Sequence, residues 1–242
     1  MFSYKKSPLR RHLPEYATEI TLIFISLGLF VFYRLTEHML DGSTGDFDRR
    51  VLLWFRNPLD LSDPIGPHSL EVAVRDATAL GGLLILGLLV LSACGYLWLS
   101  RKRSLAIFIG MSVTLGTLLN TLLKDLIARA RPDLFAHATD AAFSSFPSGH
   151  AMMSTMVYLT LGALLSLSTE NRRIKAYILF WSVVLPLIVG LSRLYLGVHW
   201  PTDIIAGWIA GATWSLLCLW VYLHFINGNE KKKEKKGLQQ DA

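Results

Sequence analysis

The chain of 242 residues is 52% hydrophobic and only 17% charged, and its mean hydropathy is +0.40, whereas an ordinary soluble domain carries about 25% charged residues. This composition excludes a soluble enzyme, a disordered chain, a repeat solenoid and a secreted disulfide scaffold. The formal charge of +6 would favour a nucleic-acid partner only if it were gathered on one soluble face; the charges lie instead between long apolar windows, so we expect a membrane protein with no nucleic-acid partner.

Six apolar windows predict six transmembrane helices. Five of them lack Asp, Glu, Lys and Arg and are close to the roughly 17 to 25 residues that cross the hydrocarbon of a bilayer. The first reaches that length only by including Glu19 and Arg34 at its ends, where charged heads can lie at the interface. The windows are 20–33, 80–99, 104–123, 151–169, 176–192 and 204–229.

The predicted fold class is therefore all-α and polytopic. We expect residues 1–242 to form a single membrane-embedded domain with its core at residues 78–226. Two cysteines, Cys94 and Cys218, lie inside apolar windows and predict two buried thiols without a disulfide.

The segment before the first window is basic, and a basic stretch followed by an apolar one can imitate a secretory signal. No small-x-small cleavage site follows at residues 35–41. We therefore expect an uncleaved first helix. The basic residues are Lys5, Lys6, Arg10 and Arg11.

The first outer loop, residues 38–78, contains the segment DFDRRVLLWF. Its apolar residues recur at helical spacing opposite Asp48, Arg49 and Arg50, which predicts a short interfacial helix lying on the membrane. Prolines then break the chain before the second span. The apolar residues are Phe47, Val51, Leu52, Trp54 and Phe55, and the prolines are Pro58, Pro64 and Pro67.

The charges are distributed unequally between the two sides of the predicted bundle. The N-terminus, the loops at 100–103 and 170–175 and the C-terminal tail share one side and hold 15 of the 24 Lys and Arg residues. By the positive-inside rule, both termini are expected in the cytoplasm. We expect the lysine-rich tail, residues 230–242, to be a solvated stop after the last helix, with binding of anionic lipid or of a partner as the alternative.

The first of three polar clusters is KDLIARARP, which follows the third span. Arg131 lies seven positions after Lys124, about two helical turns, so both cations project from one face if the helix continues. Two cations placed in this way could hold one anion. The alternative is that Lys124 snorkels to the interface and Arg131 decorates a loop.

The second cluster, Phe146-Pro147-Ser148-Gly149-His150, stands immediately before the fourth span. Ser148 is a natural N-cap, and Gly149 lets backbone N–H groups approach a ligand closely. The start of this helix therefore suits an anion, with His150 at its rim. An ordinary helix start would show the same residues.

The third cluster is Ser192-Arg193, followed after five residues by His199-Trp200-Pro201-Thr202-Asp203. Pro201 suits the first turn of a helix. Asp203 lies four residues after His199, close enough to accept one imidazole N–H and leave the other nitrogen free as a base, nucleophile or ligand. An ion pair near a membrane end is the alternative.

Together these clusters, K-x6-RP at 124–132, PSGH at 147–150 and SR-x5-H-x3-D at 192–203, resemble the type 2 phosphatidic acid phosphatase (PAP2) superfamily. The six spans with outward motifs are similar to its integral-membrane bacterial branch of phosphatidylglycerophosphatases and undecaprenyl-diphosphatases. The segment ATALGG at 77–82 also looks like one seen in bacterial members, and Arg129 lies outside the pattern.

The resemblance implies a membrane lipid phosphatase of the bacterial cell membrane, with its active site outside the cytoplasm. It implies that His199 attacks phosphorus to form a phosphohistidine, that Asp203 orients His199, and that His150 protonates the leaving group. Phosphate would be bound by Lys124, Arg131, Ser148, Gly149 and Arg193. The partners implied are a lipid phosphate substrate and the bilayer.

No cluster of carboxylates predicts a Mg²⁺ site, since Asp125, Asp133 and Asp140 are scattered in sequence, so we expect hydrolysis without a metal or other cofactor.

Three other functions remain open: a lipid phosphotransferase, a lipid A phosphatase, and a lipid transporter or binding protein without catalysis. A vanadate-dependent oxidase of the same superfamily would share the phosphate-binding pocket, but such oxidases are soluble and this chain is not. The choice among undecaprenyl diphosphate, phosphatidylglycerol phosphate and phosphatidic acid is not made by any single residue.

Overall fold

The computed structural model describes residues 16–132 and 144–226. Within them the protein is helical apart from one antiparallel hairpin, in which Arg56 pairs with Pro64 and Asn57 with Asp60. The elements are α1 (Tyr16–Leu40), α2 (Gly45–Leu53), β1 (Arg56–Asn57), β2 (Asp60–Pro64), α3 (His68–Ala79), α4 (Leu83–Leu99), α5 (Arg103–Ile127), α6 (Gly149–Leu167), α7 (Arg172–Tyr195), α8 (Pro201–Val221) and the π-helical turn η2 (Tyr222–Ile226). The predicted basic N-terminus and lysine-rich tail lie outside the described residues.

The chain is a multi-pass membrane protein. Among the described residues, five helices are long and apolar enough to cross a membrane, namely α1, α5, α6, α7 and α8. The pair α3–α4, bent by 42° at a short break, is a sixth candidate. The six predicted windows thus correspond to five long helices and this bent pair.

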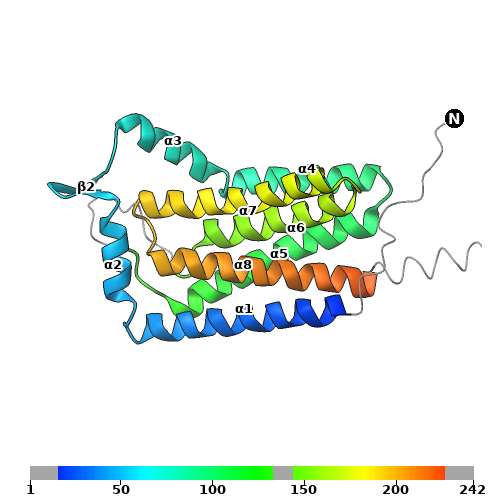
Figure 1. Ribbon diagram of the computed structural model, residues 1–242, viewed down its shortest axis with the longest axis horizontal. Coiled ribbons are helices and arrows are strands. Elements are labelled where there is room, and N and C mark those ends of the chain that lie inside the picture. The colour runs from blue at the N-terminus through cyan, green and yellow to red at the C-terminus, as the bar shows by residue number, and fades with distance from the viewer. Residues whose placement is uncertain (1–15, 133–143, 227–242) are drawn as a thin grey trace, which may run out of the picture.

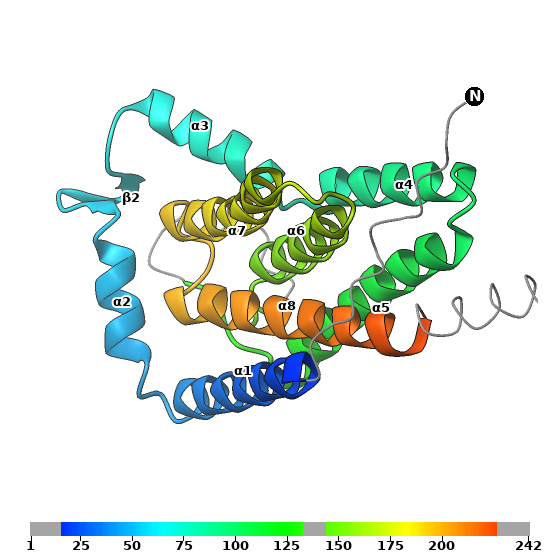
Figure 2. The same cartoon turned by 45° about the vertical axis from the view of Figure 1, so that its right-hand side comes forward.

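Helix α6 lies at the centre of the bundle and packs against α4, α5, α7 and α8 (Figures 1 and 2). Helices α6 and α8 approach closely at two glycines spaced four residues apart. A Cβ atom added at Gly207 would lie 2.8 Å from the carbonyl oxygen of Ser148, and one added at Gly211 would lie 2.5 Å from that of Met152. Small residues at this spacing let helix backbones pack together within a membrane.

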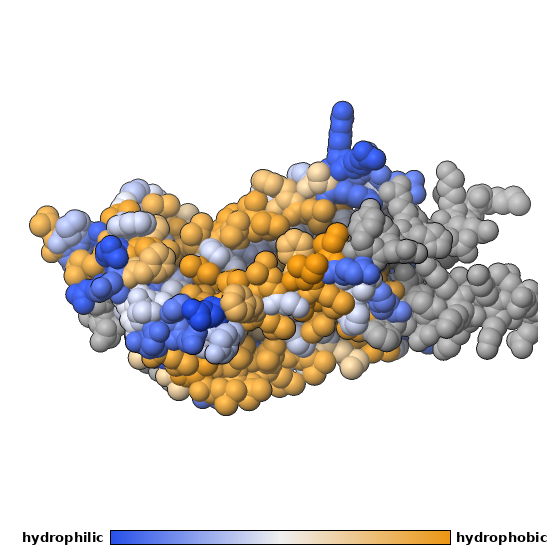
Figure 3. All heavy atoms as spheres, turned by 60° about the horizontal axis from the view of Figure 1, so that its bottom comes forward, coloured by the Kyte–Doolittle hydropathy of each residue, from blue (hydrophilic) through white to orange (hydrophobic). Residues whose placement is uncertain are grey.

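The outer surface is apolar where a bilayer would lie. Helix α1 packs on α8 and leaves Phe24, Leu29 and Phe30 exposed. Figure 3 shows hydrophobic residues over the middle of one face and hydrophilic residues at its two ends. This banding is expected of a helical bundle that spans a membrane.

Helix α2, the hairpin and α3 lie at one end of the bundle. Figure 1 shows α2 running across that end, with the hairpin and α3 beside it, while both ends of the described chain lie at the opposite end. The hairpin and α3 were not predicted as separate elements, because the prolines of this segment had indicated only a break.

The helix predicted in the outer loop is present as α2, and Arg49 and Arg50 are exposed as predicted, but the prediction that Asp48 lies on the face opposite Leu52 is wrong. Asp48 and Leu52 are buried together, at 1% and 0% exposure, whereas Trp54 is 71% exposed. The carboxylate of Asp48 therefore points into the protein, because polar groups of other segments lie there to interact with it. The predicted thiols are both free of disulfides; Cys218 is buried and Cys94 is only half-buried.

Candidate active site

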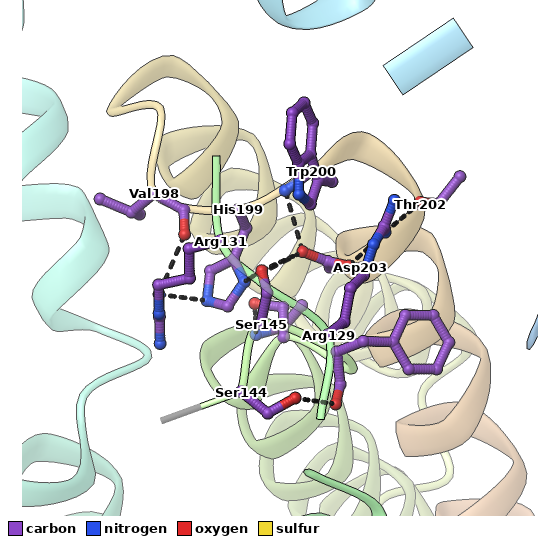
Figure 4. Close-up of polar contacts among 12 residues, drawn as sticks. Arg129, Arg131, Ser144, Ser145, Val198, His199, Trp200, Thr202 and Asp203 are labelled. Carbon is purple, nitrogen blue, oxygen red and sulfur yellow. Dashed lines mark hydrogen bonds and ion pairs between the residues drawn. The ribbon is translucent and has the colours of Figure 1, made fainter. Parts of the chain in front are cut away.

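The three polar clusters lie at the end of the bundle that α2 covers (Figure 1), and Figure 4 shows residues of the first and third clusters meeting there. The C-terminal end of α5, the segment before α6, the end of α7 and the α7–α8 loop each contribute side chains. His150 lies close enough to Lys124, Arg131, Arg193 and His199 to interact electrostatically with all four. The structure thus brings the predicted site residues of all three clusters together.

His199 lies in the α7–α8 loop and is almost completely buried, at 2% exposure. Its Nδ1 atom is 3.5 Å from Oδ2 of Asp203 and 3.3 Å from the hydroxyl of Ser145 (Figure 4). Its Nε2 atom faces the opposite way, 3.4 Å from Nη1 of Arg131. With the proton assigned to Nδ1, which faces acceptors, Nε2 keeps a lone pair directed toward the cationic side.

Burial lowers the pKa of His199 to about 4, and the positive charges of Arg131 and Arg193 act in the same direction. The hydrogen bond and charge of Asp203 oppose this shift without cancelling it. The imidazole is therefore neutral at physiological pH. A neutral imidazole is the form that can act as a nucleophile.

Asp203 is fully buried in the first turn of α8, where Pro201 begins the helix. Its Oδ2 atom accepts hydrogen bonds from the backbone N–H of Trp200, at 2.9 Å, and from the Ser145 hydroxyl. Its Oδ1 atom accepts one from Arg129 at 2.6 Å. These three hydrogen-bond donors stabilise the charged form of the carboxylate beside His199.

The helix that carries Lys124 does not continue to Arg131, so the condition for both to project from one helical face is not met, and Arg131 lies in an irregular segment as in the alternative. Helix α5 ends at Ile127 because Ala128 adopts a left-handed conformation with φ of 48°. The chain then runs irregularly, and Nη1 of Arg131 donates to the Val198 carbonyl oxygen at 2.9 Å. Lys124 donates to the Ser144 carbonyl oxygen at 2.7 Å. Both cations reach the site, Lys124 from helix α5 and Arg131 from the irregular segment that follows it.

Arg193 is a cation with unused donor capacity. Its Nη1 atom is 3.4 Å from the hydroxyl of Thr78. Its Nε atom is buried and makes no hydrogen bond within the described part of the chain. A buried N–H without an acceptor is costly, and an anionic ligand would relieve that cost.

Ser148 caps α6, as predicted from the sequence. Its hydroxyl accepts from the N–H of Ala151 at 3.5 Å, which leaves its own proton available for donation, and its N–H donates to the Asp203 carbonyl oxygen at 3.0 Å. Gly149 lies against α5, where an added Cβ would be 3.3 Å from Oδ1 of Asn120. The first turn of α6 is therefore held against both α5 and α8.

The α3–α4 break lies against the same site. A Cβ added at Gly81 would meet Val189 at 2.3 Å and the His150 ring at 3.4 Å. Tyr158 donates to the Leu80 carbonyl oxygen at 2.9 Å. The ATALGG segment thus packs on His150 and, through Thr78, contacts Arg193.

Two residues that contact the His199–Asp203 pair directly or through Arg129 were not predicted to belong to the site. Ser145 contacts both His199 and Asp203, and its only sequence signal is its position directly before Phe146-Pro147. Asp48 reaches the site from α2, 81 residues before Arg129. No spacing in the sequence indicates this contact.

The described residues include no group of three or more His, Cys, Asp or Glu side chains that could hold a metal ion. Asp125 is among them, whereas Asp133 and Asp140 lie outside the described ranges. The site instead gathers cations and N–H donors, which suit an anion such as phosphate.

Comparison with known proteins finds relatives that are similar to part of this chain. Phosphatidylglycerophosphatase B of Bacillus subtilis is 39% identical over 108 residues, covering 42% of this chain and 51% of the relative. The undecaprenyl-diphosphatase of Sulfolobus acidocaldarius is 31% identical over 122 residues, covering 48% and 55%. This chain therefore spans about half the length of the curated relatives that it matches.

The similarity extends to a solved structure, the crystal structure of a transmembrane PAP2-type phosphatidylglycerolphosphate phosphatase from Bacillus subtilis. The TM-score is 0.70 at 25% sequence identity, covering 86% of this chain and 96% of that one. The family model described as the PAP2 superfamily matches residues 105–226, half of the chain. The chain belongs to the PAP2 superfamily.

Proposed function

We propose that the protein is a membrane lipid phosphatase that removes a terminal phosphate or diphosphate phosphoryl group from a lipid, at a site on the outer face of the membrane. The observation that carries this proposal is the convergence of a neutral, carboxylate-oriented imidazole with cations at one end of a membrane-spanning bundle. Phosphoryl transfer needs a nucleophile in line with the leaving oxygen and positive groups around the other oxygens.

In the proposed reaction, the lone pair of His199 Nε2 forms a bond to phosphorus while the bond from phosphorus to the leaving oxygen breaks. His150 gives its proton to that oxygen, so the lipid leaves as an alcohol, or as a monophosphate if the substrate is a diphosphate. Water then attacks the phosphohistidine, His150 takes a proton from it, and the P–N bond breaks to release inorganic phosphate. Asp203 orients His199 and stabilises the positive charge of the phosphorylated ring.

Lys124, Arg131 and Arg193 would hold the phosphate oxygens together with the Ser148 hydroxyl and the Gly149 N–H. The buried Nε of Arg193, which has no acceptor among the described residues, supports this assignment. We assign no metal to the reaction, and the whole chain would act as one membrane-embedded domain.

A lipid is the proposed substrate class because the site is built from helix ends at a membrane interface. A lipid headgroup can enter such a site sideways while its tails stay in the bilayer. Both ends of the described chain lie at the other end of the bundle (Figure 1), and the cation-rich segments favour the cytoplasm for that end. The names of the relatives support a panel of candidates and do not choose among them.

The test is to incubate purified protein in detergent with undecaprenyl diphosphate, phosphatidylglycerol phosphate, phosphatidic acid, lipid A phosphate and a soluble sugar phosphate, and to measure released phosphate. His199→Ala is the control and should lose activity by orders of magnitude. Release of phosphate from the sugar phosphate and from none of the lipids would contradict the proposal that the substrate enters the site sideways from the bilayer. Transfer of the phosphoryl group to a second lipid without release would identify a phosphotransferase.

A further inference from the structure

Asp48 is a buried carboxylate outside the region that the family model matches. It lies on α2, is 1% exposed, and accepts three hydrogen bonds. The donors are the backbone N–H of Thr202 at 2.9 Å, the Thr202 hydroxyl at 2.7 Å and Nη2 of Arg129 at 2.7 Å. A carboxylate is kept in such a place only when it is paired and hydrogen-bonded.

Arg129 connects this carboxylate to the one beside His199. Its Nη2 atom donates to Asp48. Its Nη1 atom donates to Oδ1 of Asp203 at 2.6 Å and to the Thr202 hydroxyl at 2.8 Å (Figure 4). Its guanidinium lies 5.6 Å from the centre of the Trp200 ring, and its side chain is 15% exposed. One planar cation is thus held between two buried carboxylates.

This arrangement gives the two oxygens of Asp203 different tasks. Oδ1 is occupied by Arg129, which leaves Oδ2 to face Nδ1 of His199. Because Asp48 shares the guanidinium, the triad Asp48–Arg129–Asp203 keeps a net charge of −1. Without Asp48, Arg129 would neutralise Asp203 alone, and less negative charge would face the imidazole when it becomes positive.

We propose that Asp48 and Arg129 are positioning residues for the His199–Asp203 pair, so that α2 is a working part of the site. This assigns a task to Arg129, which lies outside the three motifs. The inference rests on the proposed function, because the pair's task is attack on phosphorus.

The kinetic test compares Asp48→Asn with Asp46→Asn, which removes the same charge from an exposed position on the same helix. Asp48→Asn should lower kcat by about 10- to 100-fold with KM changed less than twofold, since the groups that bind phosphate are untouched. Asp46→Asn should leave both unchanged. In an Arg129→Gln background, Asp48→Asn should cause no further loss of kcat, because the bridge is already gone.

Additive losses in the double variant would overturn the proposal, because they would mean that Asp48 only caps α8 through Thr202. A rise in KM at unchanged kcat would also overturn it. If Asp48→Asn fails to fold, Arg129→Lys carries the same test, since a lysine keeps the charge but cannot bridge both carboxylates in the same plane.

A second measurement needs no substrate and therefore separates this inference from the proposed function. In protein labelled with ¹⁵N-histidine and assigned with His199→Ala, the ring signals of His199 should shift in Asp48→Asn and stay unchanged in Asp46→Asn. Unchanged signals in Asp48→Asn would overturn the positioning role. If the wild-type protein released no phosphate from any lipid, only the proposed function would fail.

Discussion

Ser145 offers a sharp test of the geometry around His199. Its side chain is fully buried, its hydroxyl donates to Oδ2 of Asp203, and its oxygen lies 3.3 Å from Nδ1 of His199. Ser145→Ala removes this hydroxyl with little change in volume. Asp203 keeps its bonds from Trp200 and Arg129, so the fold should persist while the alignment of the imidazole loosens.

The expected fall in kcat follows from the type of hydrogen bond that is lost. A hydrogen bond to a charged group contributes about 1.5–3 kcal/mol, and about 1.36 kcal/mol corresponds to a tenfold change in rate. If that contribution is made in the transition state, kcat falls about 10- to 150-fold. KM should change little, because Lys124, Arg131 and Arg193 are untouched.

The assay is steady-state release of phosphate from the best lipid substrate, with Ser144→Ala as the matched control. Among the residues that the structure describes, the Ser144 hydroxyl contacts the Phe146 carbonyl oxygen, at 3.4 Å, and its loss should leave kcat within twofold of the wild type. A Ser145→Ala variant that turns over like the wild-type protein would refute the view that this hydroxyl helps to align the His199–Asp203 pair.

Three further predictions concern pH, packing and orientation. Because burial lowers the pKa of His199 to about 4, the acid limb of kcat/KM due to this residue should lie near pH 4 in a pH–rate profile, and a limb near its ordinary value of about 6.5 would contradict the assignment. The same lowered pKa contributes to the free energy of unfolding above pH 6.5, and this contribution is lost as the pH falls from 6.5 through 4, because the unfolded chain binds the proton first. In His199→Ala, the free energy of unfolding should therefore depend less on pH over this range. Gly207→Ala should lower thermal stability and activity together, since its Cβ would lie 2.8 Å from a backbone oxygen, whereas Gly87→Ala, with open space around it, should not. In a background without cysteines, Leu59→Cys should react with an impermeant thiol reagent from outside the cell and Glu170→Cys should not; the reverse pattern would invert the proposed orientation.

The membrane-spanning helices could be predicted from the sequence because their signal is local. Charge-free windows of spanning length leave few other structures, since every backbone group must be satisfied inside the segment. The N-cap at Ser148 and the helix start at Pro201 are also local, and the structure places both as expected. Motif spacing identified the residues that meet at the site without giving their geometry.

What could not be predicted depends on contacts that are distant in sequence or on a single backbone angle. Asp48 looked like part of a solvated polar face because its partner Thr202 lies 154 residues away. The end of α5 depends on the left-handed conformation of Ala128, a residue type that ordinarily favours the helix. One torsion thus separates the predicted shared face of Lys124 and Arg131 from the observed arrangement.

The charge balance of the site depends on the part of the chain that precedes the family region. Four cations, Lys124, Arg129, Arg131 and Arg193, meet two buried carboxylates, Asp48 and Asp203, so these groups carry a formal surplus of two positive charges. A phosphate dianion would supply the two missing negative charges, and buried charges are tolerated only when they are compensated. Since Asp48 comes from α2 and Thr78 contacts Arg193 from the end of α3, the elements before residue 105 belong to the electrostatics of the site as well as to its anchoring in the membrane.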